Sequence, residues 1–155
     1  MKKTVYLDTT IPSFLFDERE RSSFFADITK KWWEEESSNF DVCLSRETIT
    51  ELSQGEIPHL LKALDFALKL EVLPDTNEII EIAEIYIKNK LMPQILKGDS
   101  IHLAFASFYK VDFLLTWNCN HLANANKRQQ IRIINSRLNL PTPDIITPLE
   151  LFREN

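Results

Sequence analysis

The chain is poor in glycine and cysteine, and these shortages exclude several kinds of site. Only two of its 155 residues are glycine. It therefore contains neither the G-x-G-x-x-G loop that cradles a dinucleotide nor the glycine-rich phosphate loop of nucleotide hydrolases. The two cysteines, Cys43 and Cys119, show no metal-ligand spacing and no disulfide framework. We expect both to be small buried thiols beside apolar runs.

The chain also lacks an excess of positive charge and any long hydrophobic run. Its 18 Lys and Arg residues against 23 Asp and Glu residues give a net charge of −5. Nucleic-acid binding through a generally basic surface is therefore excluded. No stretch approaches the roughly 18 apolar residues of a membrane span. The apolar run behind Lys2 and Lys3 stops at Asp8, unlike a secretion signal, so the expected location is cytoplasmic.

What the sequence does contain is an alternation of short apolar runs with amphipathic segments. The runs predict strands at 4–7, 41–44, 71–73, 111–116 and 145–147, and the amphipathic segments predict helices at 18–36, 57–70, 78–90, 99–109 and 121–138. Thr9 or Thr10 and Ser45 are candidate caps of two shorter helices, the first with Pro12 in its opening turn. One side of the helix at 57–70 is expected to carry four leucines, Leu60, Leu61, Leu64 and Leu68, and the helix at 78–90 is expected to turn inward Ile79, Ile82, Ala83 and Tyr86. Strand runs without polar alternation are typical of buried parallel strands. The fold class is therefore α/β, a single domain over residues 1–155 built as a three-layer α/β/α sandwich around a central parallel sheet of about five strands.

Acidic residues stand where this sheet would bring them together. Asp8 ends the first strand, Glu51 lies on the helix after the second, and Asp99 opens the helix that follows Gly98. Asn118 follows the strand at 111–116. Ligands of open parallel sheets bind beyond the carboxyl ends of the strands, and three carboxylates there repel one another unless a cation neutralises them. Oxygen ligands favour Mg²⁺ or Mn²⁺, so Asp8, Asp99 and Glu51 are the predicted metal ligands.

Each of these residues also has a simpler interpretation. Asp8 and Asp99 are both favoured helix caps, and Asn118 is a common turn residue. Glu47, one turn before Glu51, competes for its role. His102 lies three residues after Asp99, and we expect it to be hydrogen-bonded or exposed rather than a ligand. One basic cluster on the predicted helix at 121–138 is interpreted either as a solvated helix face or as a phosphate contact: Lys127, Arg128, Arg132 and Arg137.

Four ordered segments resemble PIN-domain nucleases, in particular the toxin subunits of VapBC-type toxin–antitoxin pairs. They are residues 5–10 (VYLDTT), 45–52 (SRETITEL), 98–104 (GDSIHLA) and 114–122 (LLTWNCNHL). By position, the first three acidic residues of that family match Asp8, Glu51 and Asp99, and the choice of Glu51 over Glu47 rests on this resemblance. Thr116 matches a Ser or Thr near the site. Asn118 stands where the family usually has a fourth Asp.

The resemblance implies a function and partners. It implies a Mg²⁺- or Mn²⁺-dependent endoribonuclease that hydrolyses RNA phosphodiester bonds, neutralised by a cognate antitoxin protein and commonly homodimeric. The predicted catalytic set is Asp8, Glu51, Asp99, Asn118 and Thr116. Because Asn118 removes one charge from the set, a degenerate PIN domain that binds RNA or protein without turnover is the main alternative.

Two other enzyme classes place an Asp after a first strand, and both fit this sequence poorly. A phosphohydrolase of the haloacid-dehalogenase type needs a second Asp where Thr10 stands. A phospho-acceptor receiver domain needs acidic residues before the acceptor, where this chain has residues 2–5 (KKTV).

Overall fold

Five parallel strands form the centre of the molecule. The computed structural model describes residues 1–89, 91 and 97–154. The strands are β1 (Lys3–Leu7), β2 (Phe40–Ser45), β3 (Glu71–Leu73), β4 (Phe113–Leu115) and β5 (Asp144–Ile146). Their order is β3-β2-β1-β4-β5, and every neighbouring pair is parallel. The predicted parallel sheet of about five strands is confirmed, with β1 at its centre.

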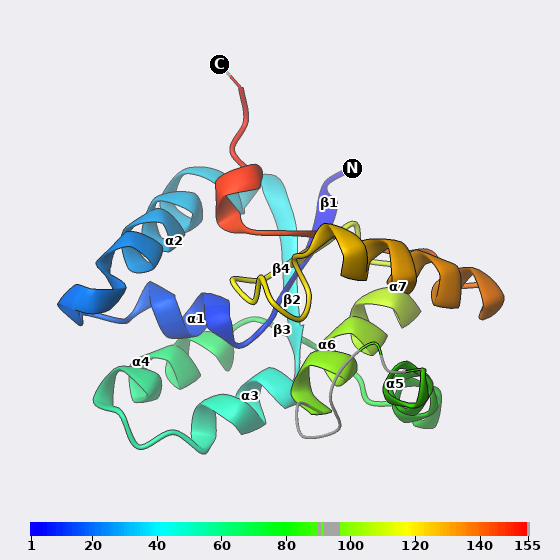
Figure 1. Cartoon of the computed structure of the whole chain (residues 1–155). Helices are drawn as coiled ribbons and strands as arrows, with labels where there is room; N and C mark the ends of the chain where they lie inside the picture. Colours follow the sequence, from blue (N-terminus) through cyan, green and yellow to red (C-terminus); the bar gives the residue numbers. More distant parts are fainter. Residues whose placement is uncertain (90, 92–96, 155) are drawn as a thin grey trace.

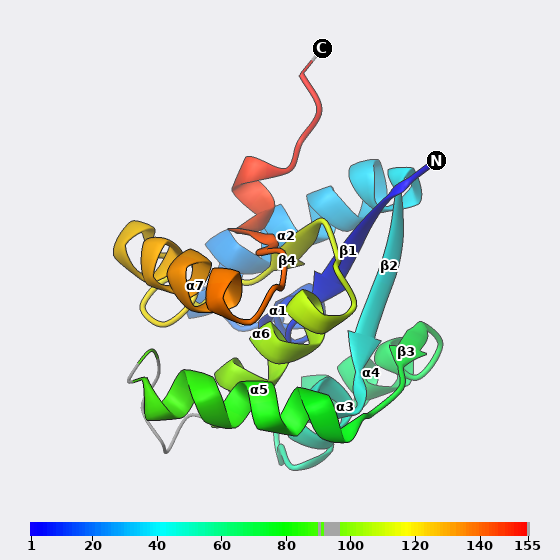
Figure 2. The same cartoon turned by 90° about the vertical axis from the view of Figure 1, so that its right-hand side faces the viewer.

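The helices cover both faces of this sheet. They are α1 (Thr10–Leu15), α2 (Ser23–Glu36), α3 (Arg46–Ser53), α4 (Pro58–Ala67), α5 (Asn77–Lys88), α6 (Lys97–Phe108) and α7 (Ala125–Arg137). Helices α1 to α4 lie on one side of the strands and α5 to α7 on the other (Figures 1 and 2). The predicted three-layer α/β/α sandwich is confirmed.

The alternation of side chains along β1 divides the core into two clusters. Val5 and Leu7 pack with Trp32 on the side of α1 to α4. Tyr6, between them in sequence, points to the other side and packs with Leu103. Successive residues of a strand face opposite sides of a sheet, so a fully buried central strand needs no polar alternation. This alternation also carries Tyr6 toward α6, where it becomes part of the candidate site.

Several predicted boundaries differ from the structure. The helix predicted from residue 121 begins only at Ala125, capped by the side chain of Asn124. The amides of Leu122 and Ala123 instead bond the carbonyl oxygen of Asn118, at 3.1 and 3.0 Å, in a turn. The predicted helix at 18–36 is split into a 3-10 turn (Glu20–Ser22) and α2. The strand predicted at 111–116 is shorter at both ends, and the predicted helix end at residue 90 lies outside the described residues.

Side-chain predictions were wrong at three positions. Of the four leucines predicted on one side of the helix at 57–70, Leu60 and Leu64 pack against the core, but Leu61 and Leu68 are 66% and 57% exposed. Helix α4 instead buries Ala63 and Ala67, whose small side chains allow close approach. Cys43 is buried as predicted, but Cys119 is exposed.

None of the helices in the described part of the chain is long and apolar enough to cross a membrane.

Candidate active site

Asp8 occupies the turn between β1 and α1, at the carboxyl edge of the sheet. Its side chain is 2% exposed. Its Oδ1 accepts hydrogen bonds from the backbone N–H of Thr10 at 3.0 Å and from the Thr10 hydroxyl at 2.5 Å. Its Oδ2 accepts one from the hydroxyl of Thr116, which follows β4. Asp8 is therefore fixed from two neighbouring strands.

Asn118 connects this carboxylate to Asp99. The backbone N–H of Asn118 donates to Thr116 Oγ1 at 2.9 Å, and its side-chain Nδ2 donates to Asp99 Oδ2 at 2.9 Å. The orientation of the Asn118 amide is fixed because its Oδ1 accepts the N–H of His121 at 3.2 Å. Asp99 lies in the first turn of α6, which begins at this edge because the helix leads into parallel strand β4. The structure therefore joins four of the predicted site residues, Asp8, Thr116, Asn118 and Asp99, by hydrogen bonds.

Glu51 reaches the same edge from α3. Its Oε1 accepts the hydroxyl of Thr9 at 2.9 Å and lies 2.6 Å from Nε2 of His102. Glu47, the competing residue, lines a neighbouring hollow with Asp75 and, from α6, Ile101. Burial raises the pKa of Glu47, and the charges of His102 and Glu51 act on it as well. Of the two glutamates, Glu51 is the one whose hydrogen bonds to Thr9 and His102 are seen.

Gly98 makes room for the Glu51 carboxylate. A Cβ atom at residue 98 would lie 3.1 Å from both carboxylate oxygens of Glu51. That separation is closer than ordinary carbon–oxygen contact, so any side chain there would displace the carboxylate. The scarce glycine is therefore used for close approach at this site.

Burial and repulsion from neighbouring carboxylates both raise the pKa of Asp8 and of Asp99. Burial raises the pKa of Asp8 to about 6, and the charge of Asp99 adds to the shift. The nearby His102 and the bonds from Thr10 and Thr116 oppose it. Burial also raises the pKa of Asp99, to which Glu51 contributes by its charge. Each carboxylate is close enough to influence the next one, as expected of groups that share a cation.

In the Glu51–His102 pair, the mutual contact outweighs the effect of burial on both pKa values. Burial alone would raise the pKa of Glu51, but the hydrogen bond and charge of His102 outweigh it, so the pKa is lowered. Burial alone would lower the pKa of His102, but the bond to Glu51 and the charges of Glu51 and Asp8 raise it. The two shifts agree on a charged pair, a carboxylate beside an imidazolium.

The donor set suits a hard cation. Asp8, Glu51 and Asp99 offer carboxylate oxygens, the ligands that Mg²⁺ and Mn²⁺ prefer. A carboxylate oxygen that accepts one hydrogen bond keeps a second lone pair for a ligand bond. Within residues 1–89, 91 and 97–154, however, no three Asp, Glu, His or Cys side chains form a ready-made metal cluster. The residues fit the cation in type and charge and are held as two hydrogen-bonded groups, one around Asp8 and Asp99 and one around Glu51.

Sequence reasoning missed part of this arrangement. Tyr6 and Ser45 were assigned only to a strand and a cap, yet their hydroxyl groups lie 2.6 Å apart beneath the site. Thr10 was a cap candidate, but its hydroxyl donates to Asp8 and accepts the backbone N–H of Trp117 at 2.9 Å. The expectation that His102 is hydrogen-bonded is confirmed. The strand alternation of β1 was the signal that places Tyr6 on the side of α6.

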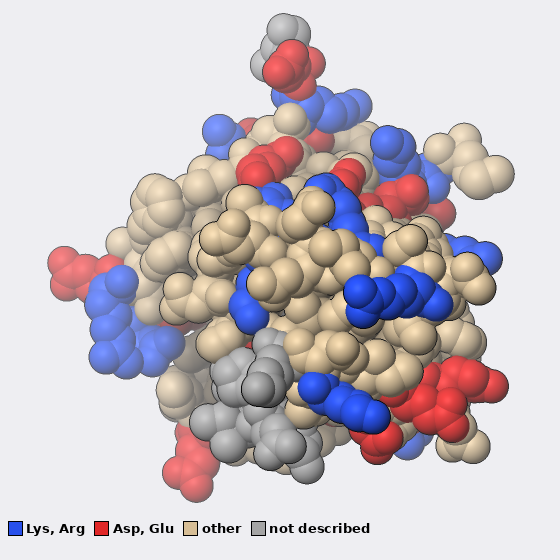
Figure 3. All heavy atoms as spheres, turned by 45° about the vertical axis from the view of Figure 1, so that its right-hand side comes forward, with Lys and Arg blue, Asp and Glu red and all other residues tan. Residues whose placement is uncertain are grey.

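On the face of the molecule shown in Figure 3, Lys and Arg side chains are separated by other residues rather than gathered in one patch. Two members of the basic cluster of α7 bond backbone carbonyl groups. Lys127 donates to the carbonyl oxygen of Leu91, and Arg128 donates to that of Ile145 at 3.2 Å. Phosphate binding by this cluster stays a prediction.

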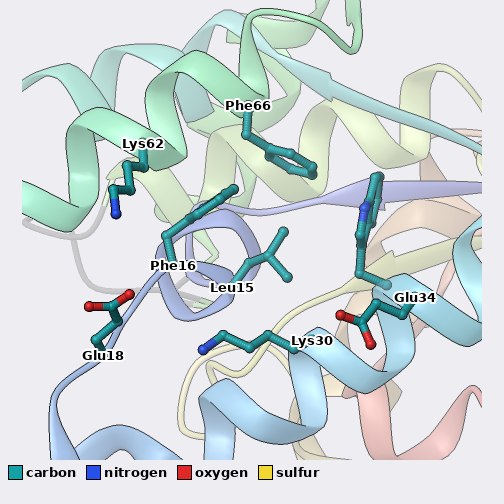
Figure 4. A pocket seen from close by; sticks show the side chains of 8 residues that line it. Leu15, Phe16, Glu18, Lys30, Glu34, Lys62 and Phe66 are labelled. Carbon is teal, nitrogen blue, oxygen red and sulfur yellow. The ribbon is translucent and has the colours of Figure 1, made fainter.

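A separate hollow of about 410 Å³ lies between α1, α2 and α4 and holds none of the predicted site residues. Figure 4 shows Leu15, Phe16 and Phe66 facing it, with charged side chains around them. The charged residues carry both signs: Glu18, Glu34, Lys30 and Lys62. Its apolar wall and mixed charges distinguish it from the acidic site at the sheet edge.

Comparison with known proteins gives a family and a fold. The comparison with curated proteins gave no match. Among solved structures, the chain is similar to one described as the crystal structure of VapBC2 from Rickettsia felis bound to a DNA fragment from their promoter. The identity is 16%, the TM-score is 0.58, and the match covers 93% of this chain and 98% of the other. The PIN domain model matches residues 5–127, which include every residue of the candidate site. The chain therefore belongs to the PIN domain family.

Proposed function

We propose that this chain is a metal-dependent endoribonuclease and the toxin of a toxin–antitoxin pair. The observation that carries the proposal is the bonded set Asp8–Thr116–Asn118–Asp99, in which a buried and a half-buried carboxylate are joined at the edge where parallel sheets bind ligands. The PIN family membership and the fold shared with the VapBC2 structure support it.

In this proposal, some residues of the site bind the metal ion and others hold those ligands in position. Asp8 and Asp99 hold a Mg²⁺ or Mn²⁺ ion, and Glu51 completes or orients the ligand set. When bound, the ion lowers the pKa of a water molecule and neutralises charge on the phosphodiester. Thr10 and Thr116 keep the Asp8 oxygens in place, and Asn118 does the same for Asp99. Side chains fixed before the substrate arrives need no reorganisation during the reaction.

The test is cleavage of a mixed tRNA and rRNA pool by the purified chain with Mn²⁺, Mg²⁺ or EDTA. Wild-type protein should cut with either metal and not with EDTA. Asp99→Asn should reduce the rate by about 100-fold or more, since one charged ligand is lost. The matched control is Asp144→Asn, an exposed aspartate at the start of β5 and therefore at the opposite edge of the sheet.

Two results contradict the proposal. Cleavage that persists at full rate in Asp99→Asn would place the activity outside this site. No cleavage by the wild type, together with RNA binding that survives in Asp99→Asn, would favour a degenerate domain. One observation favours the degenerate domain. The Asn118 amide donates to Asp99, so a neutral donor stands where the family usually has a charged ligand.

The proposed protein partner is a small antitoxin. The support is the fold shared with the solved structure of VapBC2 from Rickettsia felis bound to promoter DNA. The proposed assembly is a homodimer, and the proposed location is the cytoplasm. Light scattering of the purified chain, alone and after co-expression with the product of an adjacent short gene, measures both associations.

A further inference from the structure

Beneath the candidate site, a line of hydrogen bonds runs from the sheet to Glu51. The hydroxyl of Tyr6 lies 2.6 Å from Ser45 Oγ and 2.6 Å from Nδ1 of His102. Nε2 of His102 in turn lies 2.6 Å from Glu51 Oε1. Tyr6 and His102 are 0% and 2% exposed, so both ring positions are fixed by packing. The line joins the consecutive elements β2 and α3 to β1 and α6, which are far from them in sequence.

The donor of the hydrogen bond between His102 and Glu51 follows from the chemistry of the two groups. An ionised carboxylate can only accept, so Nε2 of His102 donates to Glu51. Nδ1 either accepts the Tyr6 hydroxyl, in the neutral ring, or donates to it, in the charged ring. In both cases Ser45 supplies the remaining partner of Tyr6. The polar side-chain atoms of Ser45, Tyr6 and His102 are therefore all paired, as buried polar networks require.

Glu51 needs such support more than the two aspartates do. Its side chain is 35% exposed and has three rotatable bonds, so without partners it would sample several rotamers. The hydroxyl of Thr9 and the ring of His102 both contact Oε1. Among the described residues, none donates a hydrogen bond to Oε2. The arrangement therefore fixes one oxygen and leaves the other for a ligand.

We propose that His102, oriented by Tyr6, is a positioning residue that holds Glu51 with Oε2 available to the cation. This inference rests on the proposed metal-dependent function. Groups that orient metal ligands affect the binding of the ion without touching it, and their loss costs about 10- to 100-fold in metal affinity. The competing explanation is that His102 merely fills the core.

Two substitutions separate these explanations, because they keep different nitrogens of the ring. The amide nitrogen of glutamine reaches about as far as Nε2, whereas that of asparagine reaches only as far as Nδ1. His102→Gln can therefore still donate to Glu51, and His102→Asn can bond only toward Tyr6. The experiment measures Mn²⁺ dissociation constants of the full chain, without RNA, by titration with detection of free Mn²⁺ by electron paramagnetic resonance.

The expected result is a split between the two variants. His102→Gln should bind Mn²⁺ within about threefold of wild type, and His102→Asn should bind about 10- to 100-fold more weakly. Tyr6→Phe should fall between them, because the ring of His102 stays but loses its orienting partner. Tyr86→Phe, which removes another buried hydroxyl on the same side of the sheet, is the matched control and should leave Mn²⁺ affinity unchanged.

The contrary results are distinct. Equal affinity in wild type and His102→Asn would overturn the inference alone, and so would an equal loss in both variants, which would indicate packing rather than a hydrogen bond. If His102→Asn does not fold, the same criterion applies to Tyr6→Phe against Tyr86→Phe. A wild type that binds no Mn²⁺ would overturn the proposed metal function and this inference together.

Discussion

Asn118 reduces the electrostatic repulsion within the site by donating a hydrogen bond to one of its carboxylates. Its Nδ2 donates to Asp99 Oδ2 at 2.9 Å, at a position where a carboxylate would face Asp99 directly. Asn118→Asp should therefore destabilise the metal-free protein by about 1–3 kcal/mol, since a hydrogen bond to a charged group becomes a repulsion. The added charge should also strengthen Mn²⁺ binding by about tenfold or more.

Urea unfolding with EDTA and Mn²⁺ titration measure these two effects of Asn118→Asp. Asn120→Asp adds the same charge two residues away at an exposed position and should change neither quantity. Unchanged metal-free stability in Asn118→Asp would show that Asp99 does not depend on the amide. A higher cleavage rate in the same variant would indicate that the fourth ligand position limits activity.

At the scale of elements, a buried polar cluster joins the three helices on one face of the sheet. The hydroxyl of Tyr86 on α5 lies 2.6 Å from Asn135 Oδ1 on α7 and 3.2 Å from Ser107 Oγ on α6. Asn135 also donates to Ser107 at 3.0 Å. Helix α7 is the most polar of these helices and buries few apolar side chains, so this cluster contributes much of its attachment.

Tyr86→Phe should destabilise the fold by about 1–3 kcal/mol, because it leaves the buried Asn135 oxygen without its donor. Tyr109→Phe is the matched control. Its hydroxyl donates to the carbonyl oxygen of Pro74 at a more exposed place, where water can substitute, so its loss should be smaller. Equal losses measured by urea unfolding would contradict the special role of the cluster.

The elements also show which parts of the fold can be predicted from sequence. Apolar periodicity located α5, whose buried residues include Ile79 and Tyr86 as expected. It was only partly right for α4, because a pattern of leucines does not show that Ala63 and Ala67 are the buried residues of this helix. The turn before α7 was missed because it depends on hydrogen bonds to the Asn118 carbonyl, and a pattern of residue types does not contain these bonds.

For the candidate site too, the sequence located what depends on element order and missed what depends on packing. Asp8, Asp99 and Asn118 were found because strand ends and helix starts place them at one edge, whatever the details of packing. Glu51 could be chosen over Glu47 only through the family resemblance, because both lie on the same short helix. The hydrogen bond between Tyr6 and His102 joins residues 96 positions apart in sequence, and only the folded structure brings the two side chains together.

The acidic site makes the stability of the protein depend on pH. Asp8 has a pKa of about 6 in the folded protein, raised mainly by burial, against an ordinary value of 3.8. The folded state therefore binds this proton more tightly than the unfolded chain does. Stability is highest near pH 4 as far as Asp8 is concerned, falls as pH rises toward 6, and stays low above that. The shift corresponds to at most about 3 kcal/mol.

Asp99, His102 and Glu51 also contribute to the pH dependence of stability and set the pH range in which it is measured. The pKa of Asp99 is also raised by burial, which adds to the loss of stability as pH rises. The raised pKa of His102, where the bond to Glu51 outweighs burial, gives stability that is present below about pH 6.5 and lost at higher pH. Glu51 acts oppositely, because its lowered pKa makes protonation below about pH 4.5 unfavourable to folding. The metal-free protein should therefore be most stable near pH 5.

Urea unfolding in EDTA at pH 5 and pH 7.5 tests this expectation on the full chain. Wild type should be more stable at pH 5, and Asp8→Asn should lose most of the difference by gaining stability at pH 7.5, since no charge is buried there. Mn²⁺ at pH 7.5 should restore stability to wild type in proportion to the logarithm of its concentration above the dissociation constant. Asp8→Asn, which lacks the carboxylate, should gain much less. A wild type that is equally stable at both pH values would mean that Asp8 is not ionised at a cost, and the main physical reason for a cation at this edge would disappear.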